Sequence, residues 1–79
     1  MATVRYFAAA RAATGLDSES VDAATVDELR DELSRRHGEP LARILPSCGL
    51  LLSGVTVHDR HSPVGPDDTV DVLPPFAGG

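Results

Sequence analysis

The first third of the chain changes from an alternating pattern to a helical one and then back. Over residues 3–7, β-favouring side chains alternate between two faces. Val4 and Tyr6 share one face, and Phe7 falls on the other. The alanine-rich segment 8–14 favours a short helical turn that ends at Gly15. A weaker strand is expected over 18–22. This order predicts strand, helical turn, strand.

The middle of the chain has the pattern of an amphipathic helix. Thr25 can cap the free amides of a helix start, and Glu28 completes a capping box. Gly38 is expected to end this helix, and a second short helix over 39–45 is expected to end at Pro46. The apolar stripe of the main helix consists of Val26, Leu29 and Leu33.

The last third predicts a hairpin and a final strand. Apolar residues 50–52, the turn pair Ser53-Gly54 and the alternating residues 55–57 indicate a tight β-hairpin. A polar loop follows over 58–68, and the segment 69–73 alternates again as a last strand. Four or five short strands and one main helix predict an α+β domain, with the helix across one face of a mixed sheet.

Composition limits what such a chain can do. A chain of 79 residues buries about 60% of the surface that its unfolded form exposes, which supports one small core. No apolar run approaches the roughly 20 residues of a membrane span, and residues 1–15 lack the pattern of a signal peptide, so we expect a cytoplasmic protein. Twelve acidic residues against seven basic ones, giving a net charge of −5, argue against nucleic-acid binding.

The metal-binding and thiol candidates are weak. His58 and His61 lie three apart in a polar loop without a third neighbouring ligand, which falls short of a zinc site. The single cysteine, Cys48, has no adjacent histidine or basic residue in sequence to activate it, so we expect a passive thiol. We therefore predict no bound metal and no bound cofactor.

The sequence after the last predicted strand is the most informative segment. It reads Pro-Pro-Phe-Ala-Gly-Gly over 74–79. Two prolines cannot continue a sheet and favour extended backbone, so we divide the chain into a domain, 1–74, and a flexible extended tail, 75–79. Two glycines without Cβ atoms can enter a narrow channel and present the carboxylate of Gly79 as a reacting group. The alternative is an ordinary frayed terminus.

These features together resemble the small subunit of molybdopterin synthase, which belongs to the MoaD group of ubiquitin-like sulfur carriers. The Phe-Ala-x-x-Arg segment separates this group from the thiamine-pathway carrier ThiS. The chain departs from the family pattern at two turns, with Ser53 where Asn is frequent and Asp67-Asp68 where Gly-Asp is frequent. The matching segments are Tyr6-Phe7-Ala8 with Arg11 and Gly15, Leu52-Ser53-Gly54, Ser62-Pro63-Val64, Asp68-Thr69-Val70 and the tail.

The resemblance implies a ubiquitin-like β-grasp fold and a chemical cycle at Gly79. A MoeB-type adenylyltransferase would use ATP to adenylate this carboxylate, and a sulfurtransferase would supply the sulfur that converts it to a thiocarboxylate. A MoaE-type large subunit, in a heterotetramer with two carriers, would then receive the tail and transfer the sulfur to cyclic pyranopterin monophosphate. The chain would be a sulfur-carrying subunit without an active site of its own.

The resemblance also implies roles for individual residues. Pro75, Phe76, Ala77 and Gly78 would insert into the partner. The motif match also places Arg11 at the partner interface. A helix covers only one face of a sheet, so we expect Phe7, Leu73 and Val57 to form a docking patch of this interface on the other face. Scattered surface apolar residues and a solvated arginine are the ordinary alternatives.

Two other functions remain open at this point. The same terminal chemistry serves sulfur carriers for thiamine, cysteine or thiolated tRNA, and protein modifiers that form isopeptide bonds. All seven basic residues are arginines, which excludes chains of this protein linked through its own lysines.

Overall fold

The computed structural model describes residues 1–74, and its elements follow the predicted order. The predicted strand 3–7 begins and ends one residue earlier, and Pro46 lies within a 3-10 turn that continues the short helix. The segment 75–79 lies outside the described residues, so the proposed tail stays a prediction. The elements are β1 (Ala2–Tyr6), α1 (Ala9–Thr14), β2 (Ser18–Val21), α2 (Val26–His37), α3 (Glu39–Ile44), the 3-10 turn η1 (Leu45–Ser47), β3 (Gly49–Leu52), β4 (Val55–Thr56) and β5 (Thr69–Leu73).

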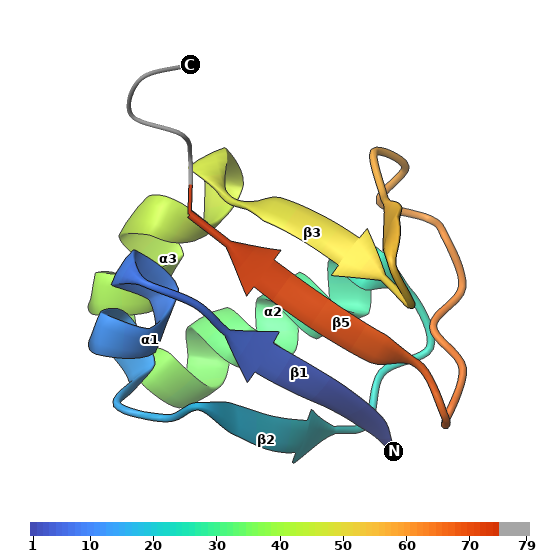
Figure 1. The fold of residues 1–79 in the computed structure, drawn as a ribbon, viewed down its shortest axis with the longest axis horizontal. Coiled ribbons are helices and arrows are strands. Elements are labelled where there is room, and N and C mark those ends of the chain that lie inside the picture. Colours follow the sequence, from blue (N-terminus) through green and yellow to red (C-terminus); the bar gives the residue numbers. More distant parts are fainter. Residues whose placement is uncertain (75–79) are drawn as a thin grey trace.

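The five strands form one mixed sheet in the order β2-β1-β5-β3-β4 (Figure 1). The central pair, β1 and β5, is parallel, and every other neighbouring pair is antiparallel. A parallel pair cannot be joined by a tight turn, and here the connection contains the helices and the β3–β4 hairpin. This is the ubiquitin-like β-grasp arrangement, which confirms the predicted fold class.

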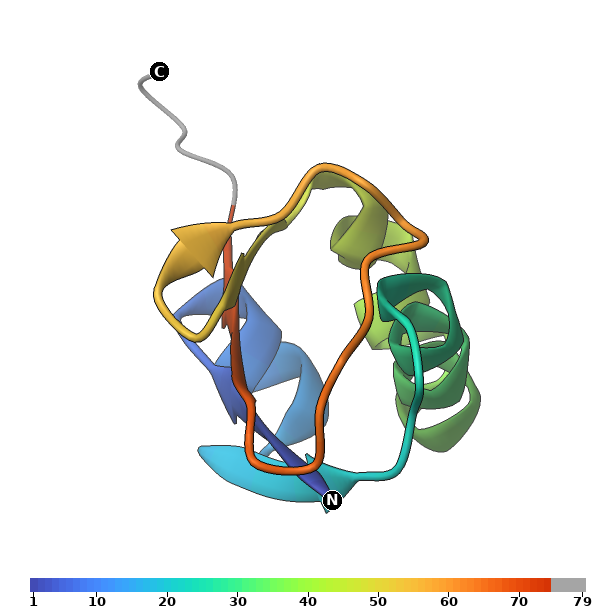
Figure 2. The same ribbon diagram turned by 90° about the vertical axis from the view of Figure 1, so that its right-hand side faces the viewer.

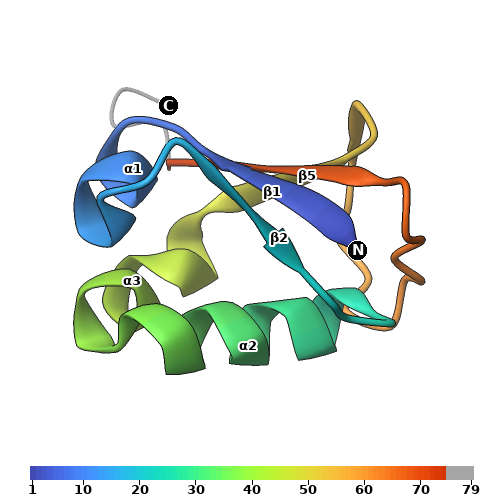
Figure 3. The ribbon, with the colours of Figure 1, turned by 90° about the horizontal axis from the view of Figure 1, so that it is seen from below.

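Within residues 1–74, the helices cover one face of the sheet and leave the other bare. Figure 3 shows α2 and α3 on the same side, beneath β1, β2 and β5. Val26, Leu29 and Leu33 of α2 are buried, so the predicted stripe faces the sheet. The core consists of Ala2, Val4, Tyr6, Ala10, Val21, Val26, Leu29, Leu33, Leu41, Leu45, Cys48, Leu50, Val64, Val70 and Val72.

The start of α2 is held by a side-chain cap and by backbone bonds to a distant loop. The hydroxyl of Thr25 accepts the amide of Glu28 at 3.2 Å, as the capping pattern predicts. The two preceding helical amides bind the distant loop: Val26 donates to Ser62 at 3.0 Å and Asp27 donates to Arg60 at 2.8 Å. Figure 2 shows this loop, drawn in orange, beside the start of α2. The loop is therefore part of the helix cap.

The β3–β4 turn keeps hairpin geometry despite its departure from the family pattern. Ser53 and Gly54 both have positive φ, 48° and 88°, as a tight turn of the type I′ kind requires. The hydroxyl of Ser53 donates to Asp68 at 2.9 Å, and the same carboxylate accepts the amide of Gly65 at 2.6 Å. These two bonds hold the pKa of Asp68 below its usual value and tie the hairpin to the start of β5.

A cluster around Glu19 joins the edge strand β2 to the end of α2. Its carboxylate accepts the buried hydroxyl of Tyr6, pairs with the ring of His37 and binds Arg36 at 3.0 Å. Tyr6 and His37 also meet edge to face, with ring centroids 5.7 Å apart. Burial and then the bond to Glu19 raise the pKa of Tyr6, which keeps its hydroxyl protonated as a donor.

Arg36 in addition covers the outer edge of β2. Its guanidinium donates to the carbonyl of Ser20 at 3.0 Å. The amide of Tyr6 donates to the carbonyl of Asp17, and in an antiparallel pair every second residue turns its backbone groups toward the neighbouring strand. By this alternation the backbone carbonyl of Ser20 points away from β1. One outward carbonyl of this edge is therefore already bonded.

We predict that Glu19→Gln destabilises the fold by about 1–3 kcal/mol at neutral pH, because a charged acceptor of several donors is lost. Burial by itself would raise the pKa of Glu19, but the bonds from Tyr6, His37 and Arg36 lower it overall. A depressed carboxyl pKa stabilises the fold above the unfolded value of about 4.3, and this stabilisation disappears as pH falls through the folded pKa. Urea unfolding from pH 7 to pH 2 measures it. If the variant lost as much stability as the wild type between pH 7 and pH 2, this role of the cluster would be contradicted.

Candidate functional site

The bare face of the sheet is the candidate site, and Figure 1 looks directly onto it. The alternation of β1 and β5 around their buried valines turns every second residue toward this face. Its centre is polar and the end next to residue 74 is apolar. The outward residues are Thr3, Arg5 and Phe7 beside Thr69, Asp71 and Leu73, with Gly49 and Leu51 on β3.

An ion pair occupies the middle of this face. Arg5 donates from Nε and Nη2 to the two carboxylate oxygens of Asp71, at 2.6 and 2.8 Å. The guanidinium carbon of Arg5 also lies 5.8 Å from the centre of the Phe7 ring. A bidentate pair with a stacked aromatic has a defined orientation, so this part of the surface presents a fixed pattern of charge.

Phe7 is positioned by backbone bonds on both sides. Its amide donates to Val72 of β5 at 3.2 Å, and its carbonyl accepts the amide of Ala10 at 3.0 Å in the first turn of α1. The side chain is 38% exposed, so the ring is available for contact although its backbone is fixed. The prediction that Phe7 lies opposite the inward residues of β1 is confirmed.

Leu73 shares this end of the face with Phe7. The β1–β5 pairing continues from Tyr6 opposite Val72, which brings Leu73 beside Phe7, and Gly49 of β3 lies on the other side of Leu73. Since Gly49 has no side chain, the flank of Leu73 on that side stays uncovered. The predicted tail residues Pro75, Phe76, Ala77, Gly78 and Gly79 follow directly and lie outside the described residues.

Arg11 lies on α1, close to the same end of the sheet. Its guanidinium is 3.3 Å from the carboxylate of Asp17, and the two side chains are 61% and 85% exposed. A long ion pair in water contributes little, so Arg11 is available to a different acidic partner at small cost. Its predicted interface role stays a prediction.

The expectation that Val57 joins Phe7 and Leu73 is wrong in its geometry. The amide of Val57 donates to the carbonyl of Leu50 at 2.9 Å, which continues the β3–β4 pairing by one residue. Leu50 is an inward, buried residue, and Val57 accordingly packs against the core. The register set by the Ser53-Gly54 turn therefore places Val57 on the inner side of the sheet.

The other sequence candidates lie away from this face. Cys48 is buried, and burial raises the pKa of its thiol, with Arg30 offsetting part of the rise, so the thiol is unreactive at neutral pH. His58 and His61 are exposed, and residues 1–74 hold no group of three side chains placed to bind a metal. In the same part of the chain, no helix is long and apolar enough to cross a bilayer.

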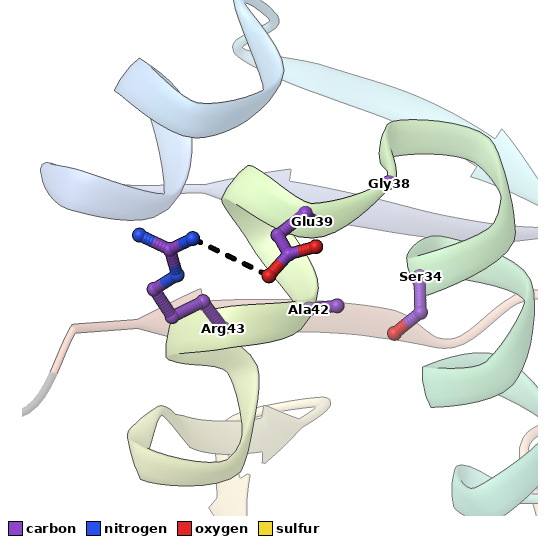
Figure 4. A pocket seen from close by; sticks show the side chains of 5 residues that line it. All are labelled: Ser34, Gly38, Glu39, Ala42 and Arg43. Carbon is purple, nitrogen blue, oxygen red and sulfur yellow. Dashed lines mark hydrogen bonds and ion pairs between the residues drawn. The ribbon is translucent and has the colours of Figure 1, made fainter.

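A hollow lies on the opposite, helical side of the molecule (Figure 4). Its two charged side chains, Glu39 and Arg43, bind each other at 3.3 Å and so neutralise each other. It offers a ligand no net charge. It is lined by Ser34, Gly38, Glu39, Ala42 and Arg43.

Comparison with known protein families assigns the chain to one family. The sequence profile of the ThiS family matches residues 4–79, so the chain belongs to the ThiS family. It has the ubiquitin-like fold of that family's sulfur carriers. A comparison with curated protein sequences finds no match.

Solved structures with the same fold include several kinds of protein. A chain of the Amycolatopsis orientalis BexX/CysO complex is 27% identical, with 100% of both chains covered and a TM-score of 0.83. A chain of the complex of subunits 1 and 2 of the Helicobacter pylori molybdopterin-converting factor is 26% identical, with 99% of this chain and 97% of that chain covered and a TM-score of 0.75. The small archaeal modifier protein 1 of Methanosarcina acetivorans shares the fold at 19% identity, a TM-score of 0.87 and coverage of 99% and 95%.

We predict a measurable coupling between Arg5 and Asp71 that exceeds the coupling between Arg11 and Asp17, because the first pair is bidentate and Asp71 is only 13% exposed. A double-mutant cycle with Arg5→Gln and Asp71→Asn, followed by urea unfolding, measures this coupling. It should decrease in 1 M salt. The same cycle on Arg11 and Asp17 is the control and should give a value near zero. Equal coupling in the two pairs would contradict the fixed geometry described for the sheet face.

Proposed function

We propose that this protein is a sulfur carrier whose Gly79 carboxylate is adenylated and then converted to a thiocarboxylate. The observation that carries the proposal is the apolar end of the bare sheet face, where Phe7 and Leu73 lie side by side next to the start of segment 74–79. A partner that receives Gly79 must approach this end. The family profile also extends through residue 79, which supports a role for the final glycines.

The chemistry divides between the carrier and its partners. A carboxylate oxygen of Gly79 attacks the α-phosphorus of ATP in an adenylyltransferase, and pyrophosphate leaves. A sulfur nucleophile provided by a sulfurtransferase then attacks the acyl carbon, and AMP leaves. The first step is needed because a carboxylate at neutral pH is a poor electrophile without a leaving group. ATP is bound by the activating partner, and we place the cycle in the cytoplasm.

We further propose that the pathway is that of molybdopterin, with the chain as the small subunit beside a MoaE-type large subunit. The support is the segment Phe7-Ala8-x-x-Arg11, together with the likeness to the converting-factor complex of Helicobacter pylori. In this arrangement Arg11 gives up its weak contact with Asp17 for an acidic group of the partner. The likeness to CysO favours cysteine biosynthesis as the second candidate.

We expect the intact mass of the protein to rise by the difference between one sulfur and one oxygen atom after incubation with an adenylyltransferase, a sulfur donor and ATP. The reason is that one carboxylate oxygen of Gly79 is replaced. Mass spectrometry measures the change. Omitting ATP should prevent it, and an unchanged mass in the complete reaction would exclude the sulfur-carrier function.

Deletion of Gly79 should abolish this mass change without loss of stability, because glycine has no side chain that could be buried in a core. The unfolding midpoint of the deletion variant serves as the control for folding. A deletion variant that still gains sulfur would show that the reacting carboxylate is not that of Gly79.

The two pathways are separated by mixing the thiocarboxylate form with a MoaE-type subunit and cyclic pyranopterin monophosphate. Formation of molybdopterin, detected as its fluorescent oxidation product, supports the first candidate. Sulfur transfer in a cysteine-synthesis system without any molybdopterin supports the second.

A further inference from the structure

The connection between β1 and α1 contains a backbone conformation that alanine rarely adopts. Ala8 has φ of 49° and ψ of −118°. Its positive φ brings the Cβ against the backbone, which is unfavourable for a residue other than glycine. Glycine has no Cβ and adopts this conformation freely. The chain therefore keeps an unfavourable residue at this position.

The surrounding hydrogen bonds impose the conformation on Ala8. On its N-terminal side, the amide of Phe7 is bonded to Val72 at 3.2 Å. On its C-terminal side, the carbonyl of Ala8 itself accepts the amide of Ala12 at 3.0 Å, and the carbonyl of Phe7 accepts that of Ala10 at 3.0 Å. Strand and helix are both fixed, so the bend between them falls on a single residue.

The methyl group of Ala8 has no role in the core. Ala8 is exposed and is not among the buried residues or those packed against them. Its neighbour Phe7 is the exposed aromatic of the candidate site. A methyl group that strains the backbone and contacts no core residue contributes nothing to folding that glycine would not provide.

We propose that Ala8 is kept for contact with a partner, and that Phe7 and Ala8 form one preorganised apolar surface for the protein that receives the C-terminal segment. This inference rests on the proposed function. The occupant is a partner protein that presents an apolar patch, and its place follows from where the described chain stops. Phe7 lies beside Leu73, and the six residues from 74 to 79 span at most about 20 Å when extended. A partner holding Gly79 therefore lies within reach of Ala8.

Preorganisation explains why strain is compatible with binding. Because the backbone on both sides of Ala8 is fixed before any partner arrives, little conformational entropy is lost on association. Phe7 and Ala8 are consecutive and both exposed, and Arg5, which pairs with Asp71, lies 5.8 Å from the centre of the Phe7 ring. The partner surface should accordingly be apolar opposite Phe7 and Ala8, and polar where it meets the ion pair.

The decisive variant is Ala8→Gly, which should raise stability and lower affinity together. Relief of the strained φ, offset in part by the greater freedom of glycine when unfolded, should raise the unfolding midpoint by about 2–6 °C. Loss of one methyl group from the contact should weaken binding of the adenylyltransferase that charges the wild-type chain by about fourfold. Calorimetric titration and thermal unfolding measure the two effects.

Two further variants serve as controls. Ser53→Gly removes the other positive-φ side chain of the described residues, at the opposite end of β5 where Ser53 binds Thr69, and should leave the affinity unchanged. Ala8→Ser keeps a Cβ atom and with it the backbone strain, so it should lack the rise in unfolding midpoint that is expected of Ala8→Gly.

The outcomes distinguish this inference from the function on which it rests. If the wild type gains sulfur and Ala8→Gly binds as tightly as the wild type, the role of Ala8 is overturned and the sulfur-carrier function stands. If Ala8→Gly is less stable than the wild type, the strain argument is overturned. If the wild type does not gain sulfur, both proposals are overturned.

Discussion

The parallel register of β1 and β5 is the constraint on which the rest of the structure depends. Val4 lies opposite Val70 and Tyr6 opposite Val72, and these four side chains form the centre of the core. The same register places Arg5 against Asp71 and Phe7 beside Leu73 on the other face. A shift of β1 by one residue would turn Arg5 toward the core and Val4 away from it, while Asp71 on β5 stayed on the other face without its partner. Core stability and the layout of the candidate site are thus fixed by one alignment.

The helices and strands could be predicted because their caps and alternation patterns involve residues that are close together in the sequence. Thr25 and Glu28 lie one helical turn apart, and their cap forms as expected. The face of Phe7 follows from simple alternation along β1. Val57 lies on the face opposite to the expected one, because its side depends on the register across the hairpin, which the pair Ser53-Gly54 sets. The pattern of the strand itself did not contain this information.

Two features, one in the fold and one beside the candidate site, could not be predicted from the sequence. Glu19 binds Tyr6 and His37, which are 13 and 18 residues away from it, and no short pattern indicates that the three side chains meet. The bend at Ala8 is equally hidden, because alanine normally signals ordinary helix. It arises only when β1 and α1 are each held by bonds to other parts of the chain. Such features depend on tertiary packing.

The guanidinium of Arg36 on the carbonyl of Ser20 has a consequence for how these molecules meet one another. Edge strands are the usual route to growth of a sheet from one molecule to the next. Here one edge strand has a bonded carbonyl, and the other, β4, contains two residues, Val55 and Thr56, too few to align a neighbouring strand firmly. Neither edge therefore offers a long strand with a full row of free backbone groups for a second copy of the chain to pair with.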